Sequence, residues 1–188
     1  MKINAEIFRN ENIFLRAFEP DDVSVLHAYL NHPALTGRRY IPWSISNDLP
    51  LSRAQAEAIL EKWAKAEKQF HLAVVARDME KVIGHANCDW GWDPHCPHIS
   101  LVLAPDYHRQ GYGSEALNVL LSYLFEHTQA HNVGGGMNDW NQAARAFAQE
   151  HGFSESGTMR RAGLRNGEFS DWIGVDILRP EWQAVKGA

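Results

Sequence analysis

The sequence predicts an α/β protein of the α+β type, built on one mixed sheet with helices packed against it. Segments in which apolar residues alternate are interleaved with segments in which they recur every three to four residues. Their order, βααβββαβαββ, gives about seven strands and about four helices. The chain has 188 residues, 45% of them hydrophobic, which suits one domain with a substantial core. We therefore predict a single domain over residues 1–182 and a C-terminal tail over residues 183–188.

The first half of the chain predicts a strand, two helices and a hairpin. Residues 7–18 carry an extended apolar pattern, and the acidic residues that follow start a helix whose apolar positions recur at helical spacing over 23–30. Ser52 is a suitable N-cap for a second helix, in which the apolar stripe runs from residue 56 to residue 63. The two strands of the hairpin are expected over residues 70–74 and 82–90, with a turn over 77–80.

The second half of the chain predicts four more strands and two more helices. The strands are expected over residues 99–104, 131–138, 153–159 and 169–178, and the helices over residues 116–124 and 143–148. The run of glycines at 134–136 weakens its strand, because glycine has no side chain to pack. The last of these helices should end at Gly152, since glycine commonly terminates helices.

The charge balance and the apolar pattern exclude two classes of partner. The chain has 18 Lys and Arg against 23 Asp and Glu, so it lacks the basic field that nucleic-acid binding needs. No apolar run approaches the roughly 18 to 20 residues that cross a bilayer, and the first residues lack a secretory pattern. The two cysteines, Cys88 and Cys96, suit a reducing compartment. We expect a cytoplasmic protein without a nucleic-acid or membrane partner.

A glycine-rich turn between a strand and a helix predicts an anion site. After Pro105 the chain reads His108-Arg109-Gln110-Gly111-Tyr112-Gly113-Ser114. Glycines let the backbone approach a ligand closely, and the free N–H groups at the start of a helix attract negative charge. The turn matches neither a P-loop, which needs a Lys before its Ser or Thr, nor a dinucleotide-binding G-x-G-x-x-G motif. The turn therefore predicts a phosphate-bearing ligand.

Two other polar clusters, one of cysteines and histidines and one of arginines, are not expected to form functional sites. His95, Cys96 and His98 with Cys88 contain metal-ligand residue types, but their spacing fits no standard zinc site and prolines interleave them. We expect no metal. The arginines at 160, 161 and 165 are expected at a solvated hairpin end.

Five segments in a fixed order resemble the GNAT superfamily of N-acetyltransferases, most closely its RimJ/RimL-like branch, related to ribosomal-protein-alanine acetyltransferases. The segments are residues 15–22, 82–84, 103–117, 141–153 and 178–182. The resemblance implies the GNAT fold, a mixed and mostly antiparallel sheet that is splayed at the strand next to the cofactor. It also implies acetyl-CoA as the co-substrate and no metal.

The resemblance assigns the cofactor residues. In the family a Gln/Arg-x-x-Gly-x-Gly/Ala turn cradles the pyrophosphate of coenzyme A. Here that turn comprises His108, Arg109, Gln110, Gly111, Tyr112, Gly113 and Ser114, and His108 departs from the usual Gln or Arg. The pantetheine arm should pair with the backbone of Leu101, Val102 and Leu103, and Asn141 should bond it from the other side. Ala144 stands where many relatives have Ser.

Direct transfer of an acetyl group to a primary amine, in a ternary complex, needs a base, an oxyanion donor and a protonated leaving group. His98 is our first candidate base, because it begins the pantetheine strand where many relatives carry Glu. Asp89 is the second candidate, either as a base or as a partner of the substrate ammonium. The amide of Val102 is the expected oxyanion donor. Ala148 occupies the position of the Tyr that serves as general acid in many relatives.

Several tryptophans fall next to the predicted acetyl site. Trp43, Trp90 and Trp140 are expected to wall the pocket for the amine, which is a protein N-terminus or a small molecule. The missing Tyr and the altered His108 leave open a second function, a non-catalytic acetyl-CoA-binding or sensor module. The chain is expected to be a monomer or a homodimer.

Overall fold

A single seven-stranded sheet forms the centre of the molecule, with the strands in the order β1-β2-β3-β4-β5-β7-β6. The computed structural model describes residues 8–35, 50–91 and 93–186. The strands are β1 (Ile13–Ala17), β2 (Gln69–Ala76), β3 (Lys81–Asp89), β4 (His98–Leu103), β5 (Asn132–Asn138), β6 (Ser154–Arg165) and β7 (Glu168–Leu178). The helices are α1 (Val23–Leu30), α2 (Arg53–Ala64), α3 (Tyr112–His127), α4 (Gln142–Glu150) and α5 (Arg179–Lys186).

The sheet is antiparallel at every contact except one. The strands β4 and β5 run parallel, and they meet at the single register pair His98 and Gly134. Beyond that pair the two strands diverge, so the sheet is splayed in its middle. The mixed, mostly antiparallel sheet of seven strands and its splay at β4 are confirmed.

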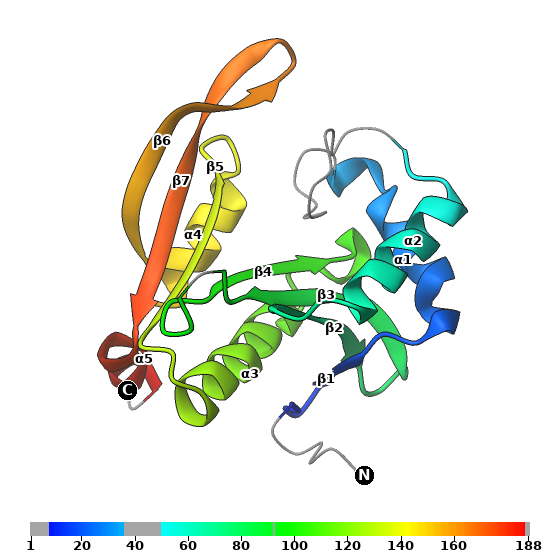
Figure 1. Ribbon diagram of the computed structural model, residues 1–188, viewed down its shortest axis with the longest axis horizontal. Coiled ribbons are helices and arrows are strands. Elements are labelled where there is room, and N and C mark those ends of the chain that lie inside the picture. The colour runs from blue at the N-terminus through cyan, green and yellow to red at the C-terminus, as the bar shows by residue number, and fades with distance from the viewer. Residues whose placement is uncertain (1–7, 36–49, 92, 187–188) are drawn as a thin grey trace.

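Helices cover both faces of the sheet (Figure 1). On one face α3 packs its apolar stripe against Ile83, Ala86 and Leu103, together with α4 and α5. On the other face α1 and α2 form a smaller core around Leu26 and Trp63. Ser52 caps α2 as expected, accepting a hydrogen bond from the amide of Gln55 at 3.2 Å.

The C-terminal end differs from the sequence prediction. Residues 183–186, expected as a tail, continue the helix α5, which makes a fifth α-helix among the described residues. Trp182 anchors this helix by packing on Phe125, with the ring centroids 5.2 Å apart. Arg179 holds its start by donating to the carbonyl of Ala130. An eight-residue helix carries too few turns for its apolar period to be recognised in the sequence.

The last two strands form a hairpin that is longer than predicted, and its turn projects beyond the helices (Figure 1). The strand expected over 153–159 extends to Arg165, past an irregularity where Arg161 has a positive φ of 55°. The turn is made by Asn166 and Gly167, both with positive φ. All three arginines belong to β6. Arg165, the last residue of that strand, lies beside the hairpin turn as expected, whereas Arg160 and Arg161 lie farther from the turn.

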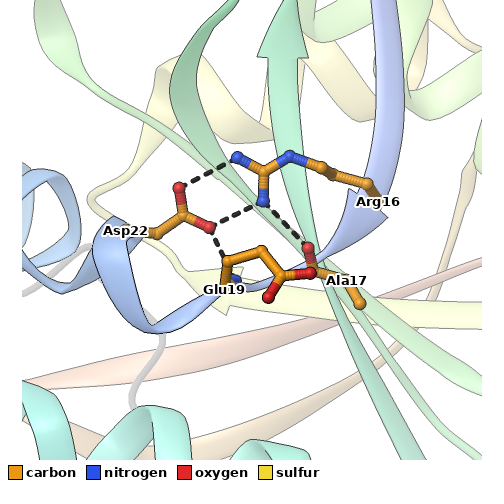
Figure 2. A network of polar contacts seen from close by, with 4 residues as sticks. All are labelled: Arg16, Ala17, Glu19 and Asp22. Atoms are coloured by element: carbon orange, nitrogen blue, oxygen red, sulfur yellow. Dashed lines mark hydrogen bonds and ion pairs between the residues drawn. The ribbon is translucent and has the colours of Figure 1, made fainter.

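An ion pair fixes the junction between β1 and α1 (Figure 2). The guanidinium of Arg16 donates to both carboxylate oxygens of Asp22, at 2.6 and 2.9 Å, and to the carbonyl of Ala17 at 2.9 Å. The amide of Glu19 donates to Asp22 at 2.8 Å. Burial by itself would raise the pKa of Asp22, but these hydrogen bonds and the nearby positive charge outweigh it and hold that pKa below its ordinary value. The ion pair thereby sets the position of α1 over the sheet.

Candidate active site

The splay exposes one edge of β4 to a ligand. The amide of Ala104 donates to the carbonyl of Ile83 at 2.8 Å, and bonded pairs in an antiparallel ladder alternate along the strand. His98, Ser100 and Val102 therefore direct their backbone groups toward β3. The alternate residues face β5, as the 2.9 Å hydrogen bond from the amide of Gly134 to the carbonyl of Pro97 shows at the closed end. Beyond the closed end, the backbone groups of Leu101 face the gap.

A cavity of about 320 Å³ occupies this gap between β4 and β5. Among the predicted cofactor residues, Leu101 and Val102 line it from β4, and Asn141 and Ala144 line it from the start of α4. The two sides that were expected to hold an extended, amide-bearing arm thus do face each other. Leu103 is turned into the main core and its side chain packs there.

The oxyanion role predicted for Val102 does not fit this geometry. The ladder turns the Val102 amide toward β3, and its side chain is buried under α1 and α2. Leu101 is the neighbouring residue whose amide faces the gap. The sequence could not separate the two residues, because the phase of the ladder depends on which pairs of β3 and β4 are bonded.

The turn that follows β4 leads into the N-terminus of α3. Gly111 is the N-cap and has a φ of 88°, a left-handed conformation that favours glycine. The first helical bond is donated by Glu115 to the carbonyl of Gly111, so the amides of Tyr112, Gly113 and Ser114 have no partner within the helix. These three amides, together with the positive end of the helix dipole, form a cradle for an anion.

His108 has a structural role in this turn. Its Nε2 donates to the carbonyl of Leu103 at 2.9 Å, which closes the far end of the open β4 edge. Gln110 similarly braces the turn by donating to the carbonyl of Asp106 at 2.7 Å. Arg109 adopts a positive φ of 59° at the bend. The anion cradle is therefore made of backbone amides, and His108 stabilises the turn that carries them by its hydrogen bond to Leu103.

A second cavity, of about 270 Å³, adjoins the first at the start of β4. Both predicted base candidates line it, because Asp89 and His98 are register partners on β3 and β4. Five residues line both cavities and form their shared boundary: Ile99, Ser100, Gly135, Gly136 and Trp172. The two cavities thus meet over the middle of β4.

The groups in the second cavity are held to different degrees. Gln69 Nε2 donates to one carboxylate oxygen of Asp89 at 2.7 Å, and the amide of Gly91 donates to the other at 2.7 Å. The ring of His98 is exposed and lies against Gly134, where a Cβ atom would be 3.1 Å from Nε2. Within the described parts of the chain, no residue hydrogen-bonds this ring. The carboxylate is fixed, whereas the imidazole is open to the pocket.

The glycine run of β5 gives space to two of these rings. A Cβ atom on Gly134 would press on His98, and one on Gly136 would lie 1.9 Å from the indole of Trp172. The glycines that weaken the strand as a sequence pattern are therefore required by the pocket.

The tryptophans are placed differently from the prediction. Trp90 packs against the core on the α3 side, and the ring of Trp140 lies under the guanidinium of Arg165 at 3.9 Å. Neither one lines the two cavities, and Trp43 lies outside the described residues. Trp172, which does line them, was missed. The sequence did carry a signal for this position: Trp172, Gly174 and Asp176 alternate along the last strand, so they share one face of the sheet.

The cysteines and histidines near 88–98 are dispersed. Burial raises the pKa of Cys88 well above its ordinary value, and this side chain belongs to the core. Cys96 Sγ lies 3.8 Å from His131 Nε2, and His95 pairs with Asp93 at 2.9 Å. The described residues contain no group of three or more His, Cys, Asp or Glu side chains arranged to hold a metal ion. Over the same residues, no helix combines the length and hydropathy needed to span a membrane.

Comparisons with known proteins agree on one family. A model of the acetyltransferase (GNAT) domain matches residues 12–154. The uncharacterised N-acetyltransferase YnaD of Bacillus subtilis is 24% identical over 172 residues, covering 92% of this chain and 96% of that protein. YoaA, a second uncharacterised N-acetyltransferase of that organism, is 21% identical over 175 residues, covering 93% of this chain and 97% of that protein.

Solved structures share the fold. A GNAT-family acetyltransferase from Bacillus anthracis matches with a TM-score of 0.78 at 21% identity, covering 92% of this chain and 98% of that one. A spermidine N-acetyltransferase from Vibrio cholerae, in complex with CoA and spermine, matches with a TM-score of 0.77 at 20% identity, covering 93% and 99%. The sheet splayed at β4, the anion cradle at α3 and the family match over most of the sequence lead to one conclusion: this chain belongs to the GNAT family of acetyltransferases.

Proposed function

We propose that this protein transfers an acetyl group from acetyl-CoA directly to a primary amine, in a ternary complex, and that it belongs to the RimJ/RimL-like branch of its family. The observation that carries the proposal is the shared boundary of the two cavities, which includes Ser100, Gly136 and Trp172. A donor in the first cavity and an acceptor in the second would meet there, which is what direct transfer requires.

The residues of the first cavity fit coenzyme A. The pyrophosphate would be held by the amides of residues 112–114, behind the left-handed Gly111. The backbone of Leu101 and the side chain of Asn141 would hold the amide-bearing arm from two sides. When bound, acetyl-CoA supplies an acetyl group activated as a thioester. The amide of Leu101 would stabilise the negative charge that develops on the carbonyl oxygen of the thioester.

The second cavity suits an ammonium group that must lose a proton. The Asp89 carboxylate, fixed by Gln69 and Gly91, would attract and orient the cation. The exposed ring of His98 would accept the proton, because its nitrogens are not engaged by the described residues and it lies beside Asp89 in register. We therefore assign His98 as the base and Asp89 as the group that binds the ammonium.

The acceptor is a small amine or a protein N-terminus. The spermidine N-acetyltransferase with a similar fold makes polyamines one class to include in a screen. The net charge of −5 favours a cationic acceptor over a polyanion. The two free cysteines, one of them buried, suit a protein that works in the cytoplasm. We propose that it works there as a monomer or a homodimer.

A non-catalytic acetyl-CoA sensor is the second candidate, favoured by Ala148 in place of a Tyr acid. Two measurements separate the candidates. A thermal shift compares acetyl-CoA, coenzyme A and ATP, and a thiol-release assay follows with a panel of polyamines, small amines and peptides. A shift with both CoA species and amine-dependent thiol release support the enzyme. A shift without thiol release from any acceptor supports the sensor, and no shift with CoA contradicts both.

A further inference from the structure

Ser100 lies where the two cavities join. It sits in the middle of β4, its backbone faces β3, and its side chain points to the face covered by α1 and α2. Of the described residues that line either cavity, Ser100 is the one that carries a hydroxyl group. Ala148, at the position where relatives place the acid, lines the first cavity with a methyl group.

A hydrogen-bonded chain of side chains from β2 and β3 reaches the Ser100 hydroxyl. Asn87 Nδ2 donates to Ser100 Oγ at 3.1 Å, and His71 Nδ1 donates to Asn87 Oδ1 at 2.7 Å. Asn87 and His71 are almost fully buried, and the indole of Trp63 stacks on the His71 ring with centroids 4.7 Å apart. The other ring nitrogen of His71, Nε2, lies 3.2 Å from Gln69 Oε1. In the tautomer that carries its proton on Nδ1, His71 donates to Asn87 Oδ1, and the Nδ2 end of the Asn87 amide meets the serine as a donor.

This arrangement determines what the hydroxyl can still do. A serine hydroxyl has one hydrogen to donate and two lone pairs to accept with. Asn87 occupies one lone pair. The O–H group and the second lone pair are left for groups in the two cavities. The hydroxyl can accept a proton from one ligand while it donates its own proton to another, and it needs no net charge to do so.

We propose that Ser100 is a catalytic residue that carries a proton from the attacking nitrogen to the departing sulfur, and that Asn87 and His71 are positioning residues that aim its hydroxyl. This inference rests on the proposed amine acetylation. After His98 has taken the first proton, the neutral amine attacks the carbonyl carbon and a C–N bond forms. The C–S bond then breaks, and its electron pair goes to sulfur. Nitrogen gives its surplus proton to Ser100 Oγ, and the hydroxyl proton of Ser100 goes to sulfur, which yields the amide and the free thiol.

The first test uses coenzyme A alone and needs no turnover. A hydroxyl that donates to sulfur stabilises the bound thiolate, so it lowers the pKa of the bound thiol. Ser100→Thr and Ser100→Val have the same shape and differ in the hydroxyl, and both are well suited to a strand. Ultraviolet absorbance of the thiolate follows its titration in each complex. We expect the pKa of bound coenzyme A to be higher in Ser100→Val than in Ser100→Thr by about 1. Equal values would overturn the proposal.

The second test measures turnover with the best amine from the screen. Ser100→Val should lower kcat about 10- to 100-fold with coenzyme A affinity within about twofold, and Ser100→Thr should stay within about threefold of the wild type. A proton inventory in mixed H₂O and D₂O should curve for the wild type, because two protons move together, and lose its curvature in Ser100→Val. If Ser100→Val does not fold, Ser100→Ala takes its place with the same expectations.

A double-mutant cycle tests the positioning role. Asn87→Ala should lower kcat in the wild type and have little further effect in Ser100→Val, because it acts through the hydroxyl. Additive effects would contradict that role. Failure of the whole reaction is distinguishable from failure of the shuttle. If no amine is acetylated by the wild type, the proposed function and the shuttle both fall. If the wild type acetylates an amine and Ser100→Val matches Ser100→Thr, the shuttle alone falls.

Discussion

The two halves of the active site are built from different parts of the polypeptide. The cofactor half is made of backbone, with the free amides at the start of α3 and the open edge of β4 at Leu101. The acceptor half is made of side chains from four strands, among them Asp89, His98 and Trp172. A site made of backbone groups depends on the conformation of the chain, so it tolerates side-chain changes such as His108 in place of the usual Gln or Arg. A side-chain site depends on every group in it, so single substitutions there should change specificity and rate.

The largest effect should come from a bulky anion in the backbone half. Gly111→Glu introduces a side chain at a φ of 88° and a negative charge beside the cradle, so we expect coenzyme A affinity to fall by about 1000-fold or more. Gly167→Glu is the matched control, since Gly167 has a φ of 80° at the distant hairpin turn. Isothermal titration should show normal affinity in the control. Retained affinity in Gly111→Glu would contradict the anion cradle.

The next largest effect should come from a substitution that removes the space occupied by the Trp172 ring in the side-chain half. In Gly136→Ala the new methyl group would lie 1.9 Å from the indole of Trp172, so this ring, which lines both cavities, must shift. We expect kcat/KM for the amine to fall about 100-fold, with a smaller loss of coenzyme A affinity. Gly157→Ala is the control, because a Cβ atom there meets nothing within 4 Å. Unchanged amine kinetics in Gly136→Ala would show that Trp172 does not shape the acceptor site.

The difference between the halves explains how much the sequence could predict. The glycines around Gly111 signal the cradle, because a left-handed turn before a helix needs a local pattern only. Most helices and strands were predictable for the same reason, because each has a local apolar pattern. The exceptions are the length of β6 and the presence of α5. The acceptor half brings together Gln69, Asp89, His98 and Trp172 from strands far apart in sequence, and only the sheet register places them side by side. Trp90 was misplaced because one residue along a strand changes the face.

The proposed base should give a smaller and more selective effect. His98→Ala removes the ring that faces the pocket and leaves Asp89 with its two donors, so kcat at neutral pH should fall about 10- to 100-fold. Coenzyme A affinity should stay within about twofold. His127→Ala, at the exposed end of α3, serves as the control for loss of an imidazole. The decisive measurement is the pH dependence of kcat/KM, and a profile identical to that of the wild type would exclude His98 as the base.

The smallest effect on the site should come from Asp22, which positions α1 and lines neither cavity. Asp22→Asn breaks a partly buried ion pair with Arg16, so we expect a loss of about 1 kcal/mol in the free energy of unfolding at neutral pH. Denaturant unfolding should show this loss. Asp21→Asn, at an exposed neighbour, is the control.

The difference in free energy of unfolding between the wild type and Asp22→Asn should depend on pH, because the pKa of Asp22 is lowered in the folded state. A carboxyl group whose pKa is lower in the folded state stabilises the fold at pH values above its unfolded pKa, whose ordinary value is 3.8. The stabilisation is lost as the pH falls through the folded pKa, because the proton then binds the folded state as well. The stability gap between the wild type and Asp22→Asn should therefore be constant near neutral pH and narrow below about 3.8. A gap that stays constant into strong acid would mean that Asp22 acts through its shape and hydrogen bonds, and that its charge contributes little to holding α1 at the end of β1.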